Sequence, residues 1–238
     1  MRENNPFKLS RRLTVTALAV REGCRAADVG CDHGKLAAWM ILTGRCEFVY
    51  ASDISEPSLK KAADLFSRLK IRHKTQTILA DGLTGLKPED ADDIVIAGLG
   101  FDTIKGIITD TDWLKNPGKH IILVPSSKHP QIRRFLYEEG FEILTESAVF
   151  EAGHAYTIIK AGYCGVKKTL TPEFAWTGKI MESPGNKSEY LRTVRQRNEK
   201  LLACTQGSGS SAAGKKRNDA AKILAYLDQA ERKQPEIF

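Results

Sequence analysis

Short apolar runs alternate with segments of helical periodicity through the first 160 residues of the chain. Five of these runs predict strands, because each is rich in β-branched or other apolar residues and stops at Gly, Asp or Pro. They lie at 25–29, 47–53, 75–80, 93–97 and 120–124. Strands separated by helices are typical of βαβ units, so the pattern predicts an α/β fold with a mostly parallel sheet.

Helix start and stop signals lie between these strands. Ser55 precedes a proline and an amphipathic segment, as an N-cap residue does. Further helices are expected at 35–42 and at 131–139, the second closed by a glycine. Two more strands, near 141–150 and 154–161, are close enough in sequence to pair as an antiparallel hairpin.

The last third of the chain shows a different pattern. Residues 163–186 contain repeated Gly and Pro and are expected to be a connector without regular structure. Helical periodicity returns at 188–204 and at 215–232, on either side of a Gly- and Ser-rich turn at 207–214 that we expect to be flexible. We expect the two helices to form an antiparallel hairpin that leans on the main domain. Coiled-coil spacing in the second helix involves Ala220, Ile223, Leu227 and Ala230.

The composition is that of a globular protein. The chain has 238 residues, of which 42% are hydrophobic and 27% charged, and this mixture excludes wholesale disorder. The longest apolar runs are too short to cross a bilayer, and the first residues lack the apolar core of a signal peptide. The five cysteines have no C-x-x-C spacing, which predicts reduced thiols, a cytoplasmic location and no metal site. A catalytic nucleophile among them is the alternative.

Positive charge is concentrated at the carboxyl-terminal end. Residues 1–160 contain 22 Lys and Arg against 21 Asp and Glu, a net charge of +1, whereas residues 161–238 contain 14 against 8, a net charge of +6. A basic module of this kind suits a polyanion such as nucleic acid. Taken alone, the same charges also fit a solvated helical hairpin.

Polar residues and glycines follow the first three predicted strands. The segment Asp28–Gly34 reads Asp-Val-Gly-Cys-Asp-His-Gly and leads directly into a helix, Asp53 ends the second strand, and 81–83 follow the third. Because the carboxyl ends of parallel strands meet at one edge, these residues are expected to lie together. Asp53 is placed to accept hydrogen bonds from ribose hydroxyls, and Asp81 to accept one from the exocyclic amine of adenine. Together they predict a nucleoside site.

The first of these loops favours S-adenosylmethionine over a dinucleotide. The G-x-G-x-x-G pattern that cradles pyrophosphate is absent. Asp32 places negative charge where a pyrophosphate would lie, whereas that charge is compatible with the sulfonium and ammonium groups of S-adenosylmethionine. A nicotinamide-dependent dehydrogenase is therefore a distant alternative.

Four segments carry a resemblance to a known family. Residues Leu9–Leu13, Ala27–Leu36, Asp81–Leu83 and Ile94–Gly100 resemble the corresponding parts of the bacterial tRNA adenine-N1 methyltransferases of the TrmK type. The Asp-Val-Gly-x-Asp-His combination is the most specific of these features. The other segments are common to class I methyltransferases.

The resemblance covers nearly the whole chain and implies both fold and function. It implies a Rossmann-like class I methyltransferase domain at 1–163, followed at 164–238 by a linker and a basic helical hairpin that binds tRNA. Members of the family methylate N1 of adenine 22 in tRNA, with S-adenosylmethionine as the methyl donor. We expect a monomer with no membrane partner.

The candidate site residues fall into three groups. Asp32 is the catalytic candidate, because a carboxylate offsets the positive charge that the adenine ring gains on methylation. The same residue could instead bind the methionine amine. Cofactor-binding candidates are Arg12, Asp28, Gly30, Cys31, Asp32, His33, Gly34, Asp53, Ile54, Asp81, Gly82, Leu83 and Gly98. Substrate-binding candidates are Phe101, Arg192, Arg195, Lys215, Lys216 and Arg217.

Several residues beside the site have open interpretations. Arg11 and Arg12 could bind a phosphate or the cofactor carboxylate, or could be solvated helix charges. His33 could donate to a base, although capping of the following helix is favoured. Glu151 and Tyr156 are interpreted mainly as core, with Tyr156 as a minor wall of the pocket.

Two loops depart from the pattern of the family. Gly98–Phe101 reads Gly-Leu-Gly-Phe where the family has Gly-Met-Gly-Gly, and Val124–Ser127 reads Val-Pro-Ser-Ser where the family tends to have Gln-Pro-Asn. Both loops belong to the side where the target base would enter, so Phe101 either stacks on a base or fills the site. Two alternatives follow: an RNA-binding protein that binds S-adenosylmethionine without transferase activity, and a methyltransferase for another nucleotide or a small molecule.

Overall fold

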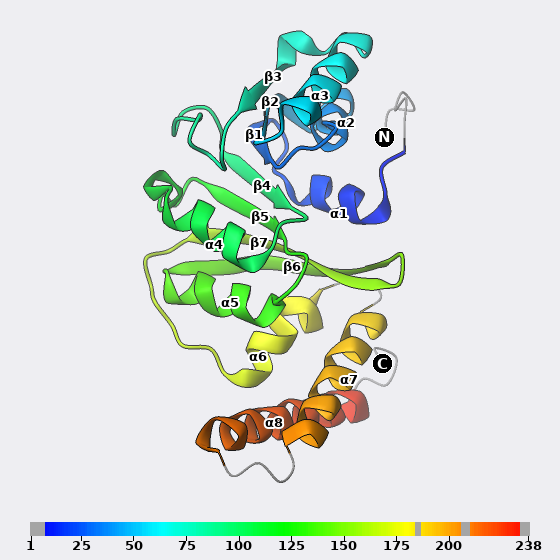
Figure 1. Cartoon of the computed structure of the whole chain (residues 1–238), viewed down its shortest axis with the longest axis vertical. Helices are drawn as coiled ribbons and strands as arrows, with labels where there is room; N and C mark the ends of the chain where they lie inside the picture. Colours follow the sequence, from blue (N-terminus) through cyan, green and yellow to red (C-terminus); the bar gives the residue numbers. More distant parts are fainter. Residues whose placement is uncertain (1–7, 184–186, 206–209, 234–238) are drawn as a thin grey trace.

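A seven-stranded sheet forms the centre of the larger part of the molecule (Figure 1). The computed structural model describes residues 8–183, 187–205 and 210–233. The strand order is β3-β2-β1-β4-β5-β7-β6; the first five strands of the chain run parallel, and β7 and β6 are antiparallel. The strands are β1 (Cys24–Val29), β2 (Cys46–Asp53), β3 (Thr75–Leu79), β4 (Asp93–Ala97), β5 (His120–Val124), β6 (Phe141–Glu151) and β7 (His154–Tyr163).

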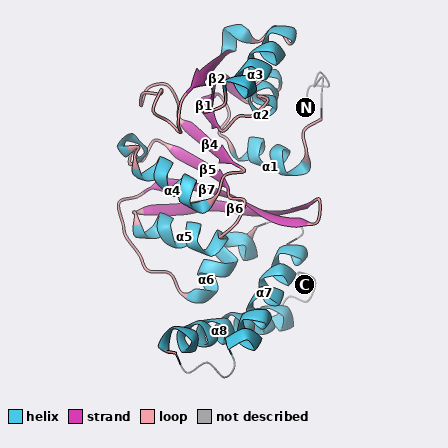
Figure 2. Cartoon of the chain, viewed as in Figure 1, coloured by secondary structure: helices cyan, strands magenta, loops and turns pink. Residues whose placement is uncertain are grey.

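Helices cover both faces of the sheet, and each face has its own hydrophobic core (Figure 2). One core contains residues of α1 (Arg11–Ala19), α2 (Lys35–Leu42) and α3 (Glu56–Arg68). The other contains residues of α4 (Phe101–Thr109) and α5 (His129–Glu138). The predicted α/β architecture with a mostly parallel sheet and a terminal antiparallel hairpin is confirmed.

The central strands are apolar on both sides because both faces are covered. In β4, Ile94 and Ile96 belong to the core of α4 and α5, and Val95 between them belongs to the opposite core. All three side chains are fully buried. A continuous apolar run is therefore the expected sequence for this strand.

Two helices near the site were not given bounds from the sequence. Helix α1 contains the β-branched residues Thr14, Val15 and Thr16, which weaken the helical signal of its sequence. Ser10 caps this helix by accepting a hydrogen bond from the Leu13 N–H at 3.3 Å. Helix α4 contains Gly106, which weakens the helical signal of its sequence. Packing of its Ile104 and Ile108 against the sheet overrides that weakness.

The prediction that 163–186 is a connector without regular structure is wrong for part of that segment. It contains α6 (Pro172–Thr177) and the 3₁₀ helix η3 (Gly178–Glu182), whereas 184–186 lie outside the described residues. Thr171 caps α6 by accepting a hydrogen bond from the Phe174 N–H at 3.2 Å. Gly and Pro mark the ends of these short helices, and tertiary contacts stabilise them.

A buried ion pair joins these helices to the sheet. The Arg133 guanidinium and the Glu146 carboxylate are both fully buried, 2.7 Å apart. Arg133 also donates to the carbonyl oxygens of Ala175 (2.7 Å) and Trp176 (3.0 Å) and to the Tyr190 hydroxyl (2.8 Å). These charge-assisted bonds compensate the cost of burying the pair. Arg133 of α5 therefore holds α6 in place together with the helix that begins at Ser188.

The predicted helical hairpin is present as α7 (Ser188–Thr205) and α8 (Ser211–Lys233). Leu191, Val194, Ile223 and Leu227 are buried between the hairpin and α6, in a third hydrophobic cluster. Helix α8 begins four residues before the predicted start, so the last part of the expected flexible turn is helical; 206–209 lie outside the described residues. None of the described helices has the length and hydropathy of a membrane span.

Candidate active site at the carboxyl ends of the strands

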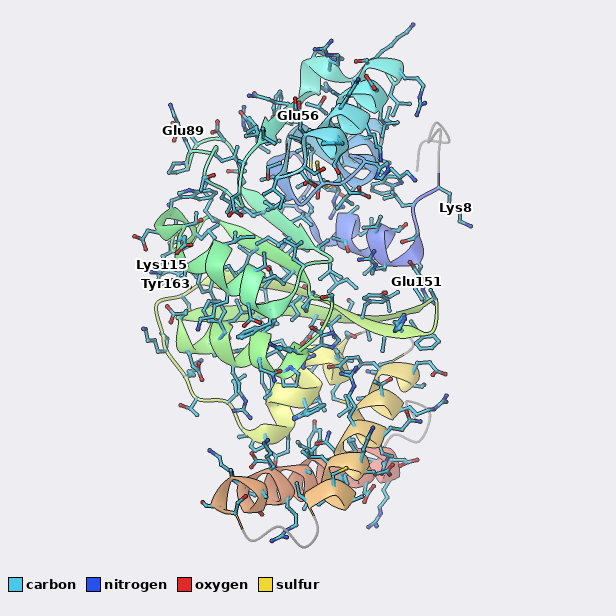
Figure 3. All side chains as sticks on the ribbon, viewed as in Figure 1. Lys8, Glu56, Glu89, Lys115, Glu151 and Tyr163 are labelled. Atoms are coloured by element: carbon cyan, nitrogen blue, oxygen red, sulfur yellow. The ribbon has the colours of Figure 1, made fainter. Side chains whose placement is uncertain are left out.

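The parallel strands end on one side of the sheet. In Figure 3, Lys115 before β5 and Tyr163 at the end of the antiparallel β7 lie on one side, and Glu151 at the end of β6 lies on the opposite side. The carboxyl ends of β1, β4 and β5 face the Glu151 side. Open α/β sheets bind ligands at this edge, so the loops here form the candidate site.

The loop after β1 is fastened to β2 by its backbone. The N–H groups of Gly30 and Cys31 both donate to the Ser52 carbonyl oxygen, at 2.9 and 3.0 Å. Gly30 has φ 71° and Gly34 has φ 66°, the left-handed region that favours glycine. A Cβ at Gly34 would lie 2.8 Å from the Phe66 ring, so Gly34 is required by the packing of α3 against the loop.

Asp53 holds the same loop from the end of β2. Its carboxylate accepts hydrogen bonds from the N–H of Asp32 at 3.0 Å and the N–H of Ser55 at 2.9 Å. Beside it, Ile54 is 74% exposed, and Leu79, the partner of Asp53 in the β2–β3 ladder, is 61% exposed. A carboxylate next to an exposed apolar surface can recognise a ribose and the flat base that it carries.

The loop after β3 lies next to a cavity. The Ser52 hydroxyl donates to the Gly82 carbonyl oxygen at 3.1 Å, and Leu83 is buried, so the loop is anchored to β2. The cavity, about 650 Å³, lies between this loop and α4. The loop after β1 is not part of its lining. It is lined by Asp81, Gly82, Leu83, Thr84, Leu86, Thr103, Gly106, Ile107, Asp110, Thr111, Asp112 and Trp113.

Asp28 is buried at the end of β1, beneath the glycine loop. Its carboxyl is 3% exposed, and within the described part of the chain its Oδ2 atom has no hydrogen-bond partner. Burial raises the pKa of Asp28, a hydrogen bond from the Ala37 backbone lowers it, and the nearby Asp53 raises it, so that the net pKa is about 7. Burial and the charge of Asp28 also raise the pKa of the Cys31 thiol, which keeps this cysteine protonated and disfavours a nucleophilic role.

Asp32 and His33 form an exposed pair at the tip of the loop. The Asp32 Oδ2 and His33 Nδ1 atoms are 2.6 Å apart, and the Lys61 ammonium lies 3.4 Å from His33 Nε2. The favoured interpretation of His33 as a helix cap is wrong. The N-cap residue of α2 is Gly34, and no side chain caps that helix.

The loops after β4 and β5 are fastened to each other. The Gly98 N–H donates to the Val124 carbonyl oxygen at 2.9 Å, and Ser126 donates to the Leu99 carbonyl oxygen through its N–H (3.0 Å) and its hydroxyl (3.2 Å). Gly98 has φ 81°, and a Cβ there would meet no atom within 4 Å. The direction in which a side chain would project from Gly98 is therefore open space.

Phe101 begins α4 at this loop and is partly buried. Its ring lies edge-on to Phe135, with 6.4 Å between the centroids. The Lys128 ammonium lies 5.6 Å from the centre of the Phe101 ring and 3.0 Å from the Asp102 carboxylate. Lys128 was missed from the sequence, where no pattern marks it as part of the site, whereas Ser126 lies in the loop 124–127 that the sequence placed on the substrate side.

Arg12 packs against the β6–β7 hairpin instead of pointing into solvent. The backbone N–H of Arg12 donates to the Glu151 carboxylate at 2.8 Å, and its guanidinium carbon lies 4.9 Å from the centre of the Tyr156 ring. Among the described residues its Nε atom has no hydrogen-bond partner. Arg11 is exposed. The interpretation of Arg12 as a solvated helix charge is therefore wrong, and Tyr156 packs at the edge of the core as expected.

The five basic residues of the hairpin that the sequence singled out fall into two groups. Arg195 of α7 binds Asp228 (2.6 Å) and Glu231 (2.9 Å) of α8, and Arg192 binds Glu189 one turn away (3.0 Å). The charge of these two arginines is compensated within the hairpin. The second group lies exposed at the start of α8, and within the described residues its members form no ion pair: Lys215, Lys216 and Arg217.

The structure thus brings the predicted residues of the first two strand ends together and places the hairpin residues elsewhere. Asp32 and Asp53 are in direct contact. Arg195 belongs instead to α7, which lies with α8 in a separate helical layer (Figure 1). Across 8–183, 187–205 and 210–233, no group of three or more His, Cys, Asp or Glu side chains could hold a metal ion.

Comparison with known proteins identifies the family. Residues 9–159 match the methyltransferase domain family. The chain is 28% identical over 157 residues, 66% of either protein, to the tRNA (adenine(22)-N(1))-methyltransferase of Bacillus subtilis. It is 34% identical to a Mycoplasma pneumoniae protein named "Putative tRNA methyltransferase", over 63% of this chain and 70% of that protein.

A solved structure is similar over nearly the whole length. It is that of Streptococcus pneumoniae Sp1610, a "putative tRNA (m1A22) methyltransferase", in complex with S-adenosyl-L-methionine. The identity is 25% and the TM-score 0.77, over 91% of this chain and 100% of that one. The predicted class I methyltransferase fold and the predicted resemblance are both confirmed. This chain belongs to the methyltransferase domain family and, within it, to the TrmK type.

Proposed function

We propose that this protein is an S-adenosylmethionine-dependent methyltransferase that methylates N1 of adenine 22 in tRNA. The observation that carries the proposal is the arrangement of Asp53, the glycine loop and the open side of Gly98 at one sheet edge, in a chain of the TrmK type. A tRNA substrate would place the activity in the cytoplasm.

The residues at this edge fit S-adenosylmethionine. Asp53 has lone pairs left after accepting from two N–H groups, and it lies beside the exposed side chain of Ile54, which suits a ribose and its adenine. The carboxyls of Asp28 and Asp32 suit an ammonium or sulfonium group and disfavour pyrophosphate. When bound, S-adenosylmethionine would supply a methyl group activated by a positively charged sulfur.

The chain's contribution to the reaction is mainly positioning. Adenine N1 carries a free lone pair at neutral pH, so the site needs no strong base. Asp53 and Asp81 would fix the nucleoside of the methyl donor, and the missing side chain at Gly98 leaves room beside it. Holding both reactants in line is sufficient to supply much of the rate enhancement.

Asp32 remains our candidate for a carboxylate near the reacting groups. Its side chain is 71% exposed and is paired with His33, so it is accessible to a ligand. Asp32→Asn removes the charge and keeps the size. We expect this variant to weaken cofactor binding if the carboxylate holds the methionine amine, and to lower kcat alone if it acts on the adenine.

The target adenine must leave its stack to reach this edge, because N1 is engaged in a Watson–Crick pair within a helix. The cluster of exposed cations Lys215, Lys216 and Arg217 is our candidate for contact with the tRNA backbone, because within the described chain none of the three forms an ion pair. Arg192 and Arg195 would contribute less, because each is already paired.

The proposal is tested by methyl transfer to unmodified tRNA transcripts that carry either A or G at position 22. Purified protein is incubated with labelled S-adenosylmethionine, and nuclease digestion with mass spectrometry locates the label. We expect 1-methyladenosine from the A22 transcript and no label in the G22 transcript. A parallel titration measures cofactor binding.

The alternatives give different results in the same assay. Cofactor binding without transfer would identify an RNA-binding protein that has lost transferase activity, as the altered loops after β4 and β5 allow. Label in both transcripts would identify a different target nucleotide. Binding of NAD and not of S-adenosylmethionine would contradict the proposal.

A further inference from the structure

In the loops after β4 and β5, a positive charge lies between an aromatic face and a carboxylate. The Lys128 ammonium lies 5.6 Å from the centre of the Phe101 ring and 3.0 Å from the Asp102 carboxylate. Phe101 and Asp102 begin α4 directly after β4, and Lys128 precedes α5 after β5. The three residues therefore come from the two loops of the substrate side.

The backbone of Lys128 adopts an unfavourable conformation. Its φ is 56° and its ψ is 39°, in the left-handed region, and its side chain does not cap α5. The two hydrogen bonds from Ser126 to the Leu99 carbonyl oxygen hold the preceding part of the loop. A strained residue that its surroundings hold in place is typical of functional sites.

A phosphate contact is the simplest role for a lysine in an enzyme that binds RNA, but the surroundings of Lys128 do not favour it. Its ammonium is already paired with Asp102, whose carboxylate, 80% exposed, would repel a phosphate at the same place. The side chain of Lys128 is itself 49% exposed and free to move away from the ring. The Phe101 ring and the Asp102 carboxylate around the ammonium can both attract a cation, whether it is flat or compact.

We propose that the face of Phe101 and the carboxylate of Asp102 stabilise the positive charge that the target adenine gains on methylation, and that Lys128 occupies this place until the base enters. The inference rests on the proposed function. In the transfer, the N1 lone pair forms the new N–CH3 bond while the electron pair of the S–CH3 bond stays on sulfur. Positive charge therefore moves from sulfur to the adenine ring, and no proton is lost.

Both groups act more strongly on the product than on the substrate. An aromatic face attracts a cation through its quadrupole, and it stacks on a neutral base without that attraction. A carboxylate beside the ring adds an electrostatic attraction that grows as positive charge develops on the adenine. Interactions that strengthen toward the transition state raise kcat, whereas equal binding of both states does not.

Three variants and one control separate these roles. Phe101→Leu keeps an apolar side chain without the aromatic face, and Asp102→Asn keeps the size without the charge. We expect each to lower kcat about tenfold, the fold-change of one cation–π or carboxylate contact, while cofactor affinity stays unchanged. Lys128→Ala should raise kcat/KM for tRNA about threefold, because the competing cation is gone. Lys105→Ala is the matched control, since Lys105 lies 6.0 Å from the centre of the Phe135 ring, one turn along α4 and outside the two loops.

A binding measurement gives a second readout that does not depend on turnover. We expect the wild-type protein to bind tRNA with 1-methyladenine at the target position more tightly than unmodified tRNA, and Phe101→Leu to lose that preference. Thermal unfolding of each variant checks the fold.

Three outcomes would contradict the inference. Transfer to A22 by the wild-type protein, with unchanged kcat in Phe101→Leu and Asp102→Asn, would overturn this inference alone. Weaker tRNA binding by Lys128→Ala, with a smaller salt dependence, would also overturn it in favour of a phosphate contact. No transfer by the wild-type protein would overturn the proposed function, and with it this inference.

Discussion

The loops after β1 and β2 and the loops after β4 and β5 are built in different ways. In the first pair, which we call the cofactor half, backbone groups and glycines set the shape, and the Asp53 carboxylate accepts from two backbone N–H groups. In the second pair, the substrate half, backbone hydrogen bonds also join the loops, but side chains meet across them as well, as Lys128 does with Phe101 and Asp102.

This difference separates what is general in the fold from what is particular to this chain. A surface made of backbone and glycine tolerates few substitutions, because each glycine is required by a left-handed φ or by close packing. A surface made of side chains can be changed by one substitution at a time. This agrees with the resemblance in sequence, which predicts that the cofactor half follows the pattern of the family and that the departures lie in the substrate half.

The largest effect is expected from breaking the cofactor half at Gly34. In Gly34→Ala the new Cβ would lie 2.8 Å from both Ala62 and Phe66, at a φ of 66°. Left-handed strain and overpacking together should lower the free energy of unfolding by about 3–5 kcal/mol, measured by thermal and urea unfolding. Gly44→Ala is the control, because Gly44 has φ 73° but no atom within 4 Å of a new Cβ. Equal destabilisation by the two variants would show that strain alone matters.

The next effect concerns the buried carboxyl of the cofactor half. Burial raises the pKa of Asp28 to about 7 in the folded protein, whereas the unfolded chain ionises near 3.8. Between pH 4 and pH 7 the folded state therefore binds a proton at Asp28 that the unfolded state has released. The contribution of Asp28 to the free energy of unfolding falls as pH rises from about 4 to 7. Asp28→Asn should be more stable than the wild-type protein at pH 8, by about 2–4 kcal/mol, and should lose that advantage toward pH 4. The difference between the two proteins is the quantity to measure, because the neutral His129, with a pKa lowered to about 4 by burial, gives a slope of opposite sign.

A smaller effect is expected at Gly98, which lies where the cofactor half and the substrate half meet. Gly98→Ala meets no atom within 4 Å, as Gly44→Ala does, so both should cost about 1 kcal/mol of stability through the positive φ. Only Gly98→Ala should weaken S-adenosylmethionine binding, by about tenfold, because its Cβ would enter the space beside the cofactor. Calorimetric titration of the two variants measures this, and equal affinities would place the cofactor elsewhere.

The smallest effect is expected outside both halves, on the hairpin. Replacing Lys215, Lys216 and Arg217 by Ala should reduce the slope of log affinity for tRNA against log salt by about 2. Arg195→Ala is the matched control, because Asp228 and Glu231 already compensate its charge. A change of slope in the control as large as in the triple variant would assign the contact to α7.

The sequence predicted the parts of this molecule that depend on local pattern. The strands, the glycine loop at Gly30 and the position of Asp53 follow from periodicity and from the rule for strand ends. Helix α6 was missed because its stability comes from Arg133, which is distant in sequence and donates to its carbonyl oxygens. Lys128 was missed for the same reason: its role depends on α4, and only the folded chain brings the two loops together.

The division into two halves is tested most directly by the affinity for S-adenosylmethionine of two variants, measured by calorimetric titration. In Asp53→Asn, an amide NH2 group, which cannot accept, replaces a carboxylate oxygen that accepts the N–H of Asp32 or Ser55. This variant should weaken the binding of S-adenosylmethionine by tenfold or more. Phe101→Leu should bind within twofold of the wild-type protein. An equal loss of affinity in both variants, or no loss in Asp53→Asn, would contradict the account.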